Sequence, residues 1–277
     1  MLGVVLSFTS ALFGEIASSL GRYEVIKKEE SAYSMAFLNL FWGAVILFVI
    51  AILRDSFVFS WASLPTFALR SVLEIVQITV AIRALIDADR STFGFLRIIT
   101  LPLLLLVDVM LGYDILPAQL AGIGLIIFSL IFLFINHGLD RKGAGHVLFI
   151  SLNAVITISL FQYDIKHFNS VEAEQGIMHL ILMSYLFLMA YLVAGENPLR
   201  LIRRPAILLQ SGSMGIGIVL HSFAFMFAPA SIVSTAARSG DILFSALAGN
   251  MVFHEKHFII KFISFLMIVG GLVLIAQ

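Results

Sequence analysis

The stretch "AARSGDILFSAL", residues 236–247, places two charged side chains inside a long apolar segment. Arg238 and Asp241 stand three residues apart, so they share one face of a helix. A charge at the centre of a bilayer costs roughly 2.5–3.5 kcal/mol on insertion scales, and charged residues in membrane helices therefore face a bundle interior or a wet cavity. The stretch predicts a membrane helix whose charged face points away from lipid.

The composition of the whole chain indicates a membrane protein. Of its 277 residues, 60% are hydrophobic and 12% are charged, which is about half the charged share of a soluble domain. Lys and Arg together number 17, as do Asp and Glu, so no excess of charge points to nucleic acid. The chain has no cysteine, which excludes disulfides and cysteine nucleophiles. The first apolar run lacks a basic leader and a clear cleavage site, and we interpret it as a retained span.

A helix that crosses a membrane needs about 20 mostly apolar residues, and ten stretches of the sequence meet this requirement. The connections between them are short, and no stretch is left for a soluble domain. The sequence therefore predicts an all-α membrane protein with ten transmembrane helices. The expected spans cover residues 2–21, 33–53, 63–86, 91–112, 117–136, 145–165, 174–194, 205–226, 229–252 and 258–276.

The two halves of the sequence resemble each other at an offset of about 140 residues. The segment "SLGRYEVIK" (19–27) aligns with "SLFQYDIKH" (159–167), and Arg97 aligns with Arg238. Because each half has an odd number of spans, the second half would enter the membrane upside-down, as in the inverted repeats of many secondary transporters. The predicted repeats cover residues 1–137 and 144–277, within one membrane domain.

The distribution of basic residues predicts an orientation. The odd-numbered connections, with Lys261 counted in the last, hold eleven Lys and Arg residues, and the even-numbered connections hold only Arg54 and Lys166. By the positive-inside rule, the odd-numbered connections are cytoplasmic and both termini lie outside. We expect a multi-pass protein of the inner (plasma) membrane.

The fourth and fifth spans carry a resemblance to a known family. Their sequence, "ALIDADRSTFGFLRIITLPLLLLVDVMLGYDILPAQLAGIGLIIFSLIFLF" (84–134), has a mid-helix proline, a Leu-Gly pair shortly before an acid, and a last helix with spaced glycines. The second half ends in a similar way, with "VFHEKHFIIKFISFLMIVGGLVLIA" (252–276). This pattern resembles the EamA repeat of the drug/metabolite transporter superfamily. The matching residues are Phe13, Gly14, Pro102, Gly112, Asp114, Gly122, Gly124, Glu255, Gly270 and Gly271.

The resemblance implies a transporter of two inverted five-helix repeats that alternates access to a central cavity. It also implies that the last helix of each half packs peripherally, so that the other helices line the cavity. Two departures leave the substrate open: Asp241 or Ile242 stands where the proline of the second copy usually falls, and Glu15 follows the aromatic-Gly pair. Eukaryotic members of the superfamily are drawn with cytosolic termini, so both orientations are kept.

Polar and small residues recur at helical spacing in the third, eighth and ninth spans. Such stripes face a bundle interior rather than lipid. Arg97 joins them in the fourth span, where Asp108 shares its face. The candidate cavity and substrate-binding residues are Glu15, Asn39, Trp42, Arg70, Glu74, Gln77, Arg97, Tyr163, Gln210, His221, Arg238 and Asp241.

The charged candidates fit a zwitterionic substrate. Arg97 and Arg238 would bind a carboxylate, since guanidinium groups hold carboxylates with two parallel hydrogen bonds. Glu15 or Asp241 would bind an ammonium group or carry a coupling proton. We counted four acids and four Arg residues within the spans, a balance that suits a zwitterion better than a simple cation or anion.

Structural roles remain alternatives for several candidates. Arg238 with Asp241, and Arg70 with Glu74, are spaced for ion pairs within one helix. Glu15 can pair with an Arg from another helix instead of binding substrate. Packing roles are also open for Asn39, Trp42 and His221.

The predicted function is secondary active transport of a small polar metabolite, an amino acid or related zwitterion, by alternating access. One alternative is a transporter of organic cations or drugs, in which Trp42, Tyr163 and Glu15 form an aromatic–acid cage. Others are a membrane-embedded lipid-modifying enzyme and a non-transporting assembly or sensor protein. No catalytic residue, metal ligand or cofactor is predicted, since enzyme motifs such as HExxH, GxSxG and the Walker loop are absent from the sequence. We expect the substrate, a proton or other coupling ion and the bilayer as partners, no nucleic acid, and a monomer or homodimer.

Overall fold

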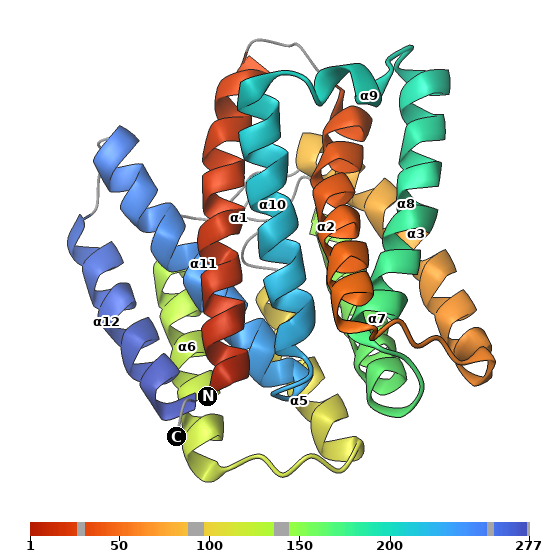
Figure 1. The fold of residues 1–277 in the computed structure, drawn as a ribbon. Coiled ribbons are helices and arrows are strands. Elements are labelled where there is room, and N and C mark those ends of the chain that lie inside the picture. The colour runs from red at the N-terminus through yellow and green to blue at the C-terminus, as the bar shows by residue number, and fades with distance from the viewer. Residues whose placement is uncertain (27–30, 88–96, 136–143, 254–257, 276–277) are drawn as a thin grey trace.

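The computed structural model is a bundle of helices with both termini at the same end (Figure 1). It describes residues 1–26, 31–87, 97–135, 144–253 and 258–275. All the regular structure of these residues is helical, which confirms the predicted all-α class for the described part of the chain. Several predictions fall outside the described residues: Glu255, the start of the span 91–112, and most of the linker between the predicted repeats.

Most helix bounds of the described residues lie within about three residues of the expected spans, but α1 ends five residues later than expected and α5 covers only part of the span 91–112. Ten helices are long: α1 (Leu2–Ile26), α2 (Ala32–Arg54), α3 (Leu64–Asp87), α5 (Thr100–Met110), α6 (Pro117–Ile135), α7 (Ala144–His167), α8 (Val171–Val193), α10 (Pro205–Ala224), α11 (Ala230–Phe253) and α12 (Phe258–Ile275). Short helical turns precede three of them: η1 (Trp61–Ser63), η2 (Arg97–Ile99) and α9 (Pro198–Leu201).

Six helices of the described chain are long and apolar enough to cross a membrane, which is consistent with a multi-pass membrane protein. They belong to α1, α2, η1 with α3, α7, α8 and α10. Shorter apolar segments lie in α5, α6 and α12. The count of ten spans therefore stays a prediction.

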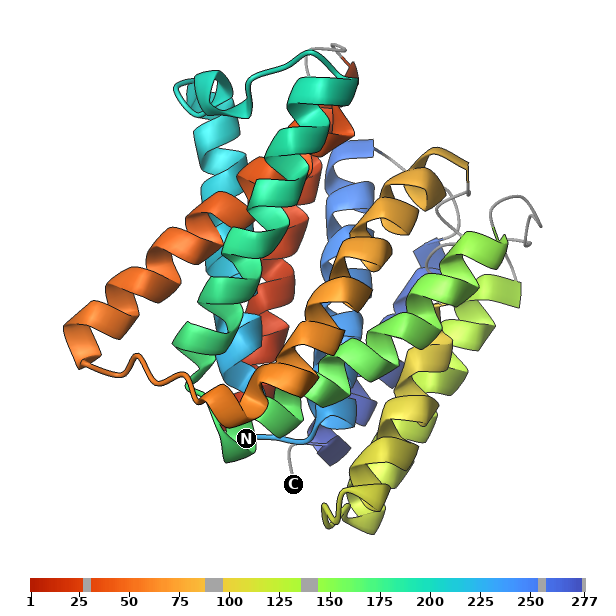
Figure 2. The same cartoon turned by 90° about the vertical axis from the view of Figure 1, so that its right-hand side faces the viewer.

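Helices of the first half pack mainly against helices of the second half. Helix α1 packs against α10 and α11, α2 against α8 and α10, and α3 against α7. Helix α5 packs against α11, and α6 against α12. Figure 2 shows α3 lying along α7, although about 80 residues separate them in the sequence. The two halves thus form one interlocked bundle.

Glycines permit the closest of these approaches. A Cβ atom on Gly215 of α10 would lie 2.6 Å from Trp42 Cβ and 2.7 Å from the Gly43 nitrogen of α2. A Cβ on Gly122 of α6 would lie 2.6 Å from the Gly271 oxygen of α12. Small residues let helix backbones meet in this way in membrane proteins. The packing of α2 on α10 and of α6 on α12 depends on them.

Hydrogen bonds join connections at each end of the bundle. At the end that carries α9, Glu196 accepts hydrogen bonds from the Ser31 nitrogen at 3.1 Å and from Ser34 Oγ at 2.5 Å. At the other end, the Ser170 nitrogen donates to the Val58 oxygen at 2.8 Å. Both contacts join a connection of the first half to one of the second half.

Glu196 also stabilises the start of α2, because a carboxylate at a helix N-terminus complements the helix dipole. Partial burial acts to raise the pKa of Glu196, but hydrogen bonds from Ser34 and Ser31 outweigh it and hold the pKa below the ordinary value. The carboxylate form is therefore the one that this contact favours.

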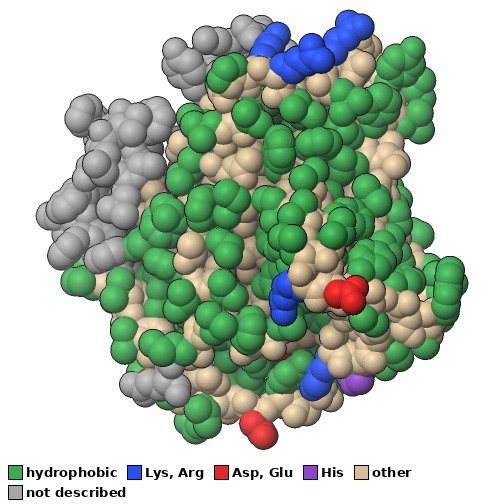
Figure 3. All heavy atoms as spheres, in the orientation of Figure 1, with side chains coloured by type: hydrophobic (Ala, Val, Ile, Leu, Met, Phe, Trp, Pro, Cys, Tyr) green, Lys and Arg blue, Asp and Glu red, His purple; other side chains and the backbone are tan. Residues whose placement is uncertain are grey.

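The visible outer face is largely apolar, with basic residues at the end near α9 and others toward the opposite end (Figure 3). Figure 3 shows hydrophobic side chains over most of the visible face and Lys and Arg side chains at the end near α9. Arg200, Arg203 and Arg204 are exposed there. Most of the other basic residues assigned to the odd-numbered connections have no described side chain.

Candidate functional site

Arg238 and Asp241 form an ion pair on α11, with Arg238 Nη1 3.5 Å from Asp241 Oδ2. Loss of water around the two side chains is the largest of the effects that the protein exerts on their charged forms. Even so, 24% of the Arg238 side chain and 48% of the Asp241 side chain stay accessible. The two side chains are therefore only partly covered by the protein.

Arg97 lies near this pair, as the repeat alignment predicts. It stands in η2, directly before α5, and interacts electrostatically with Arg238 and Asp241. Two guanidinium groups and one carboxylate thus share one region between α11 and the start of α5. The group has an excess of positive charge, which suits a ligand with a carboxylate.

His221 extends the same group from α10. Ser7 Oγ of α1 donates to the Val233 oxygen at 2.6 Å and lies 3.3 Å from His221 Nδ1. A hydroxyl has a single proton to donate, so His221 Nδ1 carries the proton shared with Ser7. His221 also interacts electrostatically with Arg238. We define the charged group as Arg97, His221, Arg238 and Asp241.

Three candidates on α2 and α10 hold buried polar atoms without hydrogen-bond partners. These atoms are Asn39 Oδ1, Trp42 Nε1 and Gln210 Oε1. The amide nitrogen of Gln210 contacts the Met35 sulfur of α2 at 2.9 Å, so α2 and α10 meet there. Buried polar atoms are nearly always hydrogen-bonded. These three atoms are exceptions to that rule, and they lie on the two helices that meet at Gln210 and Met35.

Arg70 is the centre of a second group of charges, between α3 and α8. It is 2% exposed. Its Nη1 donates to Glu174 Oε1 at 2.9 Å and its Nη2 donates to Gln175 Oε1 at 2.7 Å. Its guanidinium also lies 4.5 Å from the ring centre of Phe161 on α7. These contacts tie α3 of the first half to α7 and α8 of the second.

The hydrogen bond from Arg70 to Gln175 determines how the Gln175 amide is oriented and which nitrogen of His179 carries its proton. Because Gln175 Oε1 accepts from Arg70, the Gln175 amide nitrogen faces His179 Nε2, at 3.1 Å. His179 Nε2 is then the acceptor, and its Nδ1 carries the proton. That Nδ1 has no hydrogen-bond partner and lies close to Gly43 of α2.

Glu74 and Gln77 continue along α3 from Arg70. Glu74 Oε1 lies 3.7 Å from Arg70 Nε, and 21% of its side chain is accessible. Gln77 Oε1 accepts a hydrogen bond from Asn153 Nδ2 of α7 at 2.8 Å. The predicted polar stripe of α3 therefore faces α7 and α8, inside the bundle.

The charged group lies on α10, α11 and η2, and the Arg70 group lies on α3, α7 and α8. The turn η2 also packs against α7. That all of these residues line one cavity stays a prediction. Among the described residues, no three His, Asp or Glu side chains lie close enough together to hold a metal ion.

Glu15 is partly buried on α1 and accepts a hydrogen bond from Ser19 Oγ at 2.9 Å. Tyr163 packs against His167 and Phe168 at the end of α7, whereas Trp42 packs against Phe41 in α2. The two rings of the alternative aromatic–acid cage thus have different neighbours.

Asp108 has a structural role. Its carboxylate is fully buried and accepts hydrogen bonds from the Ala230 nitrogen at 3.2 Å and the Ser231 nitrogen at 2.6 Å. These are free N–H groups at the start of α11, which a negative charge stabilises. The sequence count treated Asp108 as part of the intramembrane charge balance, but its contacts are those of a helix cap.

The sequence analysis missed three buried acids, Glu172, Glu174 and Asp164. The last two are both 0% exposed. Glu174 is bound by Arg70 and by Asn169, whose Nδ2 lies 2.6 Å away, and Asp164 Oδ1 accepts from Thr66 at 2.6 Å. Asp164 stands in "QYDIK", within a predicted span, and Glu174 stands in "VEAEQ", at the edge of one. An acid at such a position could have been identified from the sequence as a candidate.

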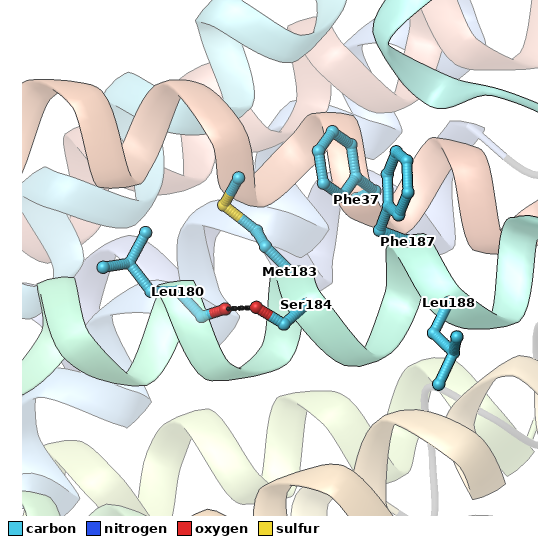
Figure 4. A pocket seen from close by; sticks show the side chains of 6 residues that line it. All are labelled: Phe37, Leu180, Met183, Ser184, Phe187 and Leu188. Atoms are coloured by element: carbon cyan, nitrogen blue, oxygen red, sulfur yellow. Dashed lines mark hydrogen bonds between the residues drawn. The ribbon is translucent and has the colours of Figure 1, made fainter.

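A pocket of about 440 Å³ is lined by residues of α2 and α8. It is apolar, and its one hydroxyl, on Ser184, already donates to the Leu180 oxygen at 2.8 Å (Figure 4). The pocket therefore has no free polar group with which to recognise a polar solute. Its lining residues are Phe37, Leu180, Met183, Ser184, Phe187 and Leu188.

Comparisons with known proteins identify the fold. No family model and no curated protein matches the chain. Twenty-eight chains of solved structures match it. One of them, titled only "Crystal structure of protein", has a TM-score of 0.78 and is 14% identical, over 99% of this chain and 98% of the other. At that identity the match shows a shared fold over the full length of both chains.

Proposed function

We propose that the chain is a secondary active transporter that moves a small polar metabolite across the inner membrane by alternating access. An amino acid or a related zwitterion is the proposed substrate. We further propose that the ten long helices are ten spans in two inverted EamA-type repeats.

The pairing of the helices supports the inverted repeat. In chain order, each long helix can be exchanged with the long helix five places later. The exchanged pairs are α1 with α7, α2 with α8, α3 with α10, α5 with α11 and α6 with α12. This exchange maps the contact of α3 with α7 onto that of α10 with α1, and the contact of α1 with α11 onto that of α7 with α5. The pairs α2 with α8, α5 with α11 and α6 with α12 map onto themselves. Such a pattern is expected of helices arranged about a pseudo-twofold axis.

The contacts at the two ends follow the same exchange. The contact of Ser31 with Glu196 joins the first and seventh connections of the proposed spans. The contact of Val58 with Ser170 joins the second and sixth, which are their partners under the exchange. The two contacts lie at opposite ends of the bundle (Figure 1), as an inverted repeat requires.

The accessible Arg238–Asp241 pair is the observation that carries the proposed function. Removing an ion pair from water costs free energy, which the pair repays only when its geometry is close and its remaining donors and acceptors are bonded. Here the two partners are 3.5 Å apart and partly accessible, with Arg97 nearby. Arg97 and Arg238 would hold the substrate carboxylate, and Asp241 would hold its ammonium group. Glu15 and Asp241 remain candidates for a coupling proton.

Binding of the substrate to the native state supplies the first test. A ligand present at about 100 times its Kd raises the unfolding free energy by about 2.7 kcal/mol. We expect an amino acid from a panel of amino acids, quaternary amines and nucleotides to raise the melting temperature of the purified protein. The same amino acid should have no effect on a variant with both Arg238→Leu and Asp241→Leu.

Other outcomes of this screen would contradict the proposal. A response to quaternary amines alone would favour the organic-cation transporter. A response of equal size in the double variant would show that the ligand binds elsewhere. Conversion of added lipid extract by the purified protein would favour the lipid-modifying enzyme.

A further inference from the structure

The charges around Arg70 do not balance. Three carboxyl groups, those of Glu74, Asp164 and Glu174, each interact favourably with this one guanidinium. Asp164 and Glu174 also interact with each other, and unfavourably. If all three were ionised, the group would hold two uncompensated negative charges inside the bundle. Buried charges without partners are strongly disfavoured in proteins, and binding of a proton removes one.

The hydrogen bonds indicate how the three carboxyl groups differ. Glu174 accepts from Arg70 Nη1 at 2.9 Å and from Asn169 Nδ2 at 2.6 Å. Donated hydrogen bonds of this kind stabilise the ionised form. Glu174 is therefore the ionised partner of Arg70. The uncompensated negative charge would then lie on Asp164 and Glu74.

Two buried atoms in the group have no hydrogen-bond partner. They are Arg70 Nε, which faces Glu74 Oε1 at 3.7 Å, and Asp164 Oδ2. Arg70 is 2% exposed and Asp164 is 0% exposed. Arg70 Nε is therefore directed at Glu74, in a long ion pair of 3.7 Å, and Thr157 also interacts with the Glu74 carboxyl.

The three carboxyl groups differ in how far the protein covers them. The side chain of Glu74 is 21% accessible, whereas Asp164 and Glu174 are 0% exposed. Glu74 is therefore the carboxyl group of the three that protein atoms leave most open to proton exchange. A metal ion is a poor fit, because no three acidic or histidine side chains of the described chain converge closely enough.

We propose that Glu74 is an exchangeable proton site, controlled by Arg70. With Glu74 protonated, Arg70 keeps its hydrogen bonds to Glu174 and Gln175. When Glu74 loses its proton to water, the carboxylate competes for the free Arg70 Nε. The titratable and charged groups that face the site are Arg70 and Glu74 on α3, Asp164 and His167 on α7, and Glu174 and His179 on α8.

The proton site has a consequence for transport, and this part rests on the proposed function. The Arg70 contacts join α3 of one proposed repeat to α7 and α8 of the other. A proton that changes those contacts changes how the two repeats are held together. Glu74 would then couple a proton to alternating access, in place of Glu15 or Asp241.

Infrared spectroscopy tests the site without any measurement of transport. A protonated carboxyl has a C=O stretch that a carboxylate lacks. Difference spectra between low and high pH are recorded on the purified protein in lipid nanodiscs. We expect a carboxylic-acid band that is lost as pH rises, is absent from Glu74→Gln and is retained in Glu172→Gln. Glu172 is a matched control because it is a buried carboxyl on α8 that pairs with Arg54 instead.

The site is overturned if Glu74→Gln keeps the band, or if Glu172→Gln loses it. Should Glu74→Gln fail to fold, Glu74→Asp keeps a carboxyl at a changed distance from Arg70. Its band should then shift in frequency or in pH midpoint, and a band identical to that of the wild type would also overturn the site. If the protein shows proton-coupled flux but no Glu74 band, the proton site is rejected and the proposed function stands. If it shows the Glu74 band but no flux, the proposed function is rejected and the proton site stands.

Discussion

Replacement of Gly215 by alanine tests the close packing of α2 against α10, beside the unsatisfied polar atoms of Asn39, Trp42 and Gln210. The added Cβ would lie 2.6 Å from Trp42 Cβ, 2.7 Å from the Gly43 nitrogen and 2.8 Å from the Trp42 carbonyl carbon. Two of these three atoms belong to the backbone, so no side-chain rotation relieves the overlap. Helix α2 must move away from α10.

Gly212 provides a matched control on the same helix. No atom lies within 4 Å of a Cβ added there. Alanine favours a helix over glycine by about 1 kcal/mol at either position. Overpacking of a well-packed contact costs about 1–3 kcal/mol. The helix preference cancels between the two variants, so Gly215→Ala should be less stable than Gly212→Ala by about 1–3 kcal/mol.

Reversible unfolding of both variants in mixed detergent micelles, followed by circular dichroism, measures this difference. The wild type is the common reference. Equal unfolding free energies for the two alanine variants would refute the close contact between α2 and α10. Greater stability of Gly215→Ala would refute it even more strongly.

Three further predictions concern the charged residues. A variant with Arg238→Leu and Asp241→Leu should stay folded in detergent and lose substrate flux, and full flux would leave the pair with a structural role only. Glu174→Gln should lower the unfolding free energy by about 3–5 kcal/mol, because it breaks a buried ion pair with Arg70; a loss below 1 kcal/mol in denaturant titrations would contradict that pairing. The folded-state pKa of Glu196 is lowered, so its stabilising contribution is present above the unfolded-state pKa and is lost as pH falls through the folded-state pKa. Melting temperatures on acidification should therefore fall more in the wild type than in Glu196→Gln, and parallel curves would count against the contact.

The sequence predicted the helices well because apolar length is a strong local signal. The expected spans 33–53 and 205–226 differ by one or two residues from α2 (Ala32–Arg54) and α10 (Pro205–Ala224). Caps fix such ends: Ser31 accepts a hydrogen bond from the Ser34 nitrogen at the start of α2. The proximity of Arg97 to Arg238 also followed from the sequence, through the alignment of the two halves.

The sequence did not predict which polar residues meet across helices. Asp108 and Arg97 share one predicted span, yet Asp108 caps α11 and Arg97 lies near the Arg238–Asp241 pair. Glu174 stood at the edge of a span, where an acid is usually solvated, but the fold brings Arg70 to it across 104 residues of sequence. Such contacts depend on the relative rotation and depth of two helices, and a periodic pattern in one helix carries neither quantity.

Counterflow in proteoliposomes tests the central claim most directly. Vesicles loaded with an unlabelled amino acid that stabilises the purified protein are diluted into the same compound, radiolabelled, at low concentration. Alternating access predicts saturable entry of label that the internal substrate accelerates, and no such acceleration in the variant with Arg238→Leu and Asp241→Leu. Entry of label that neither saturates nor responds to internal substrate would contradict the account.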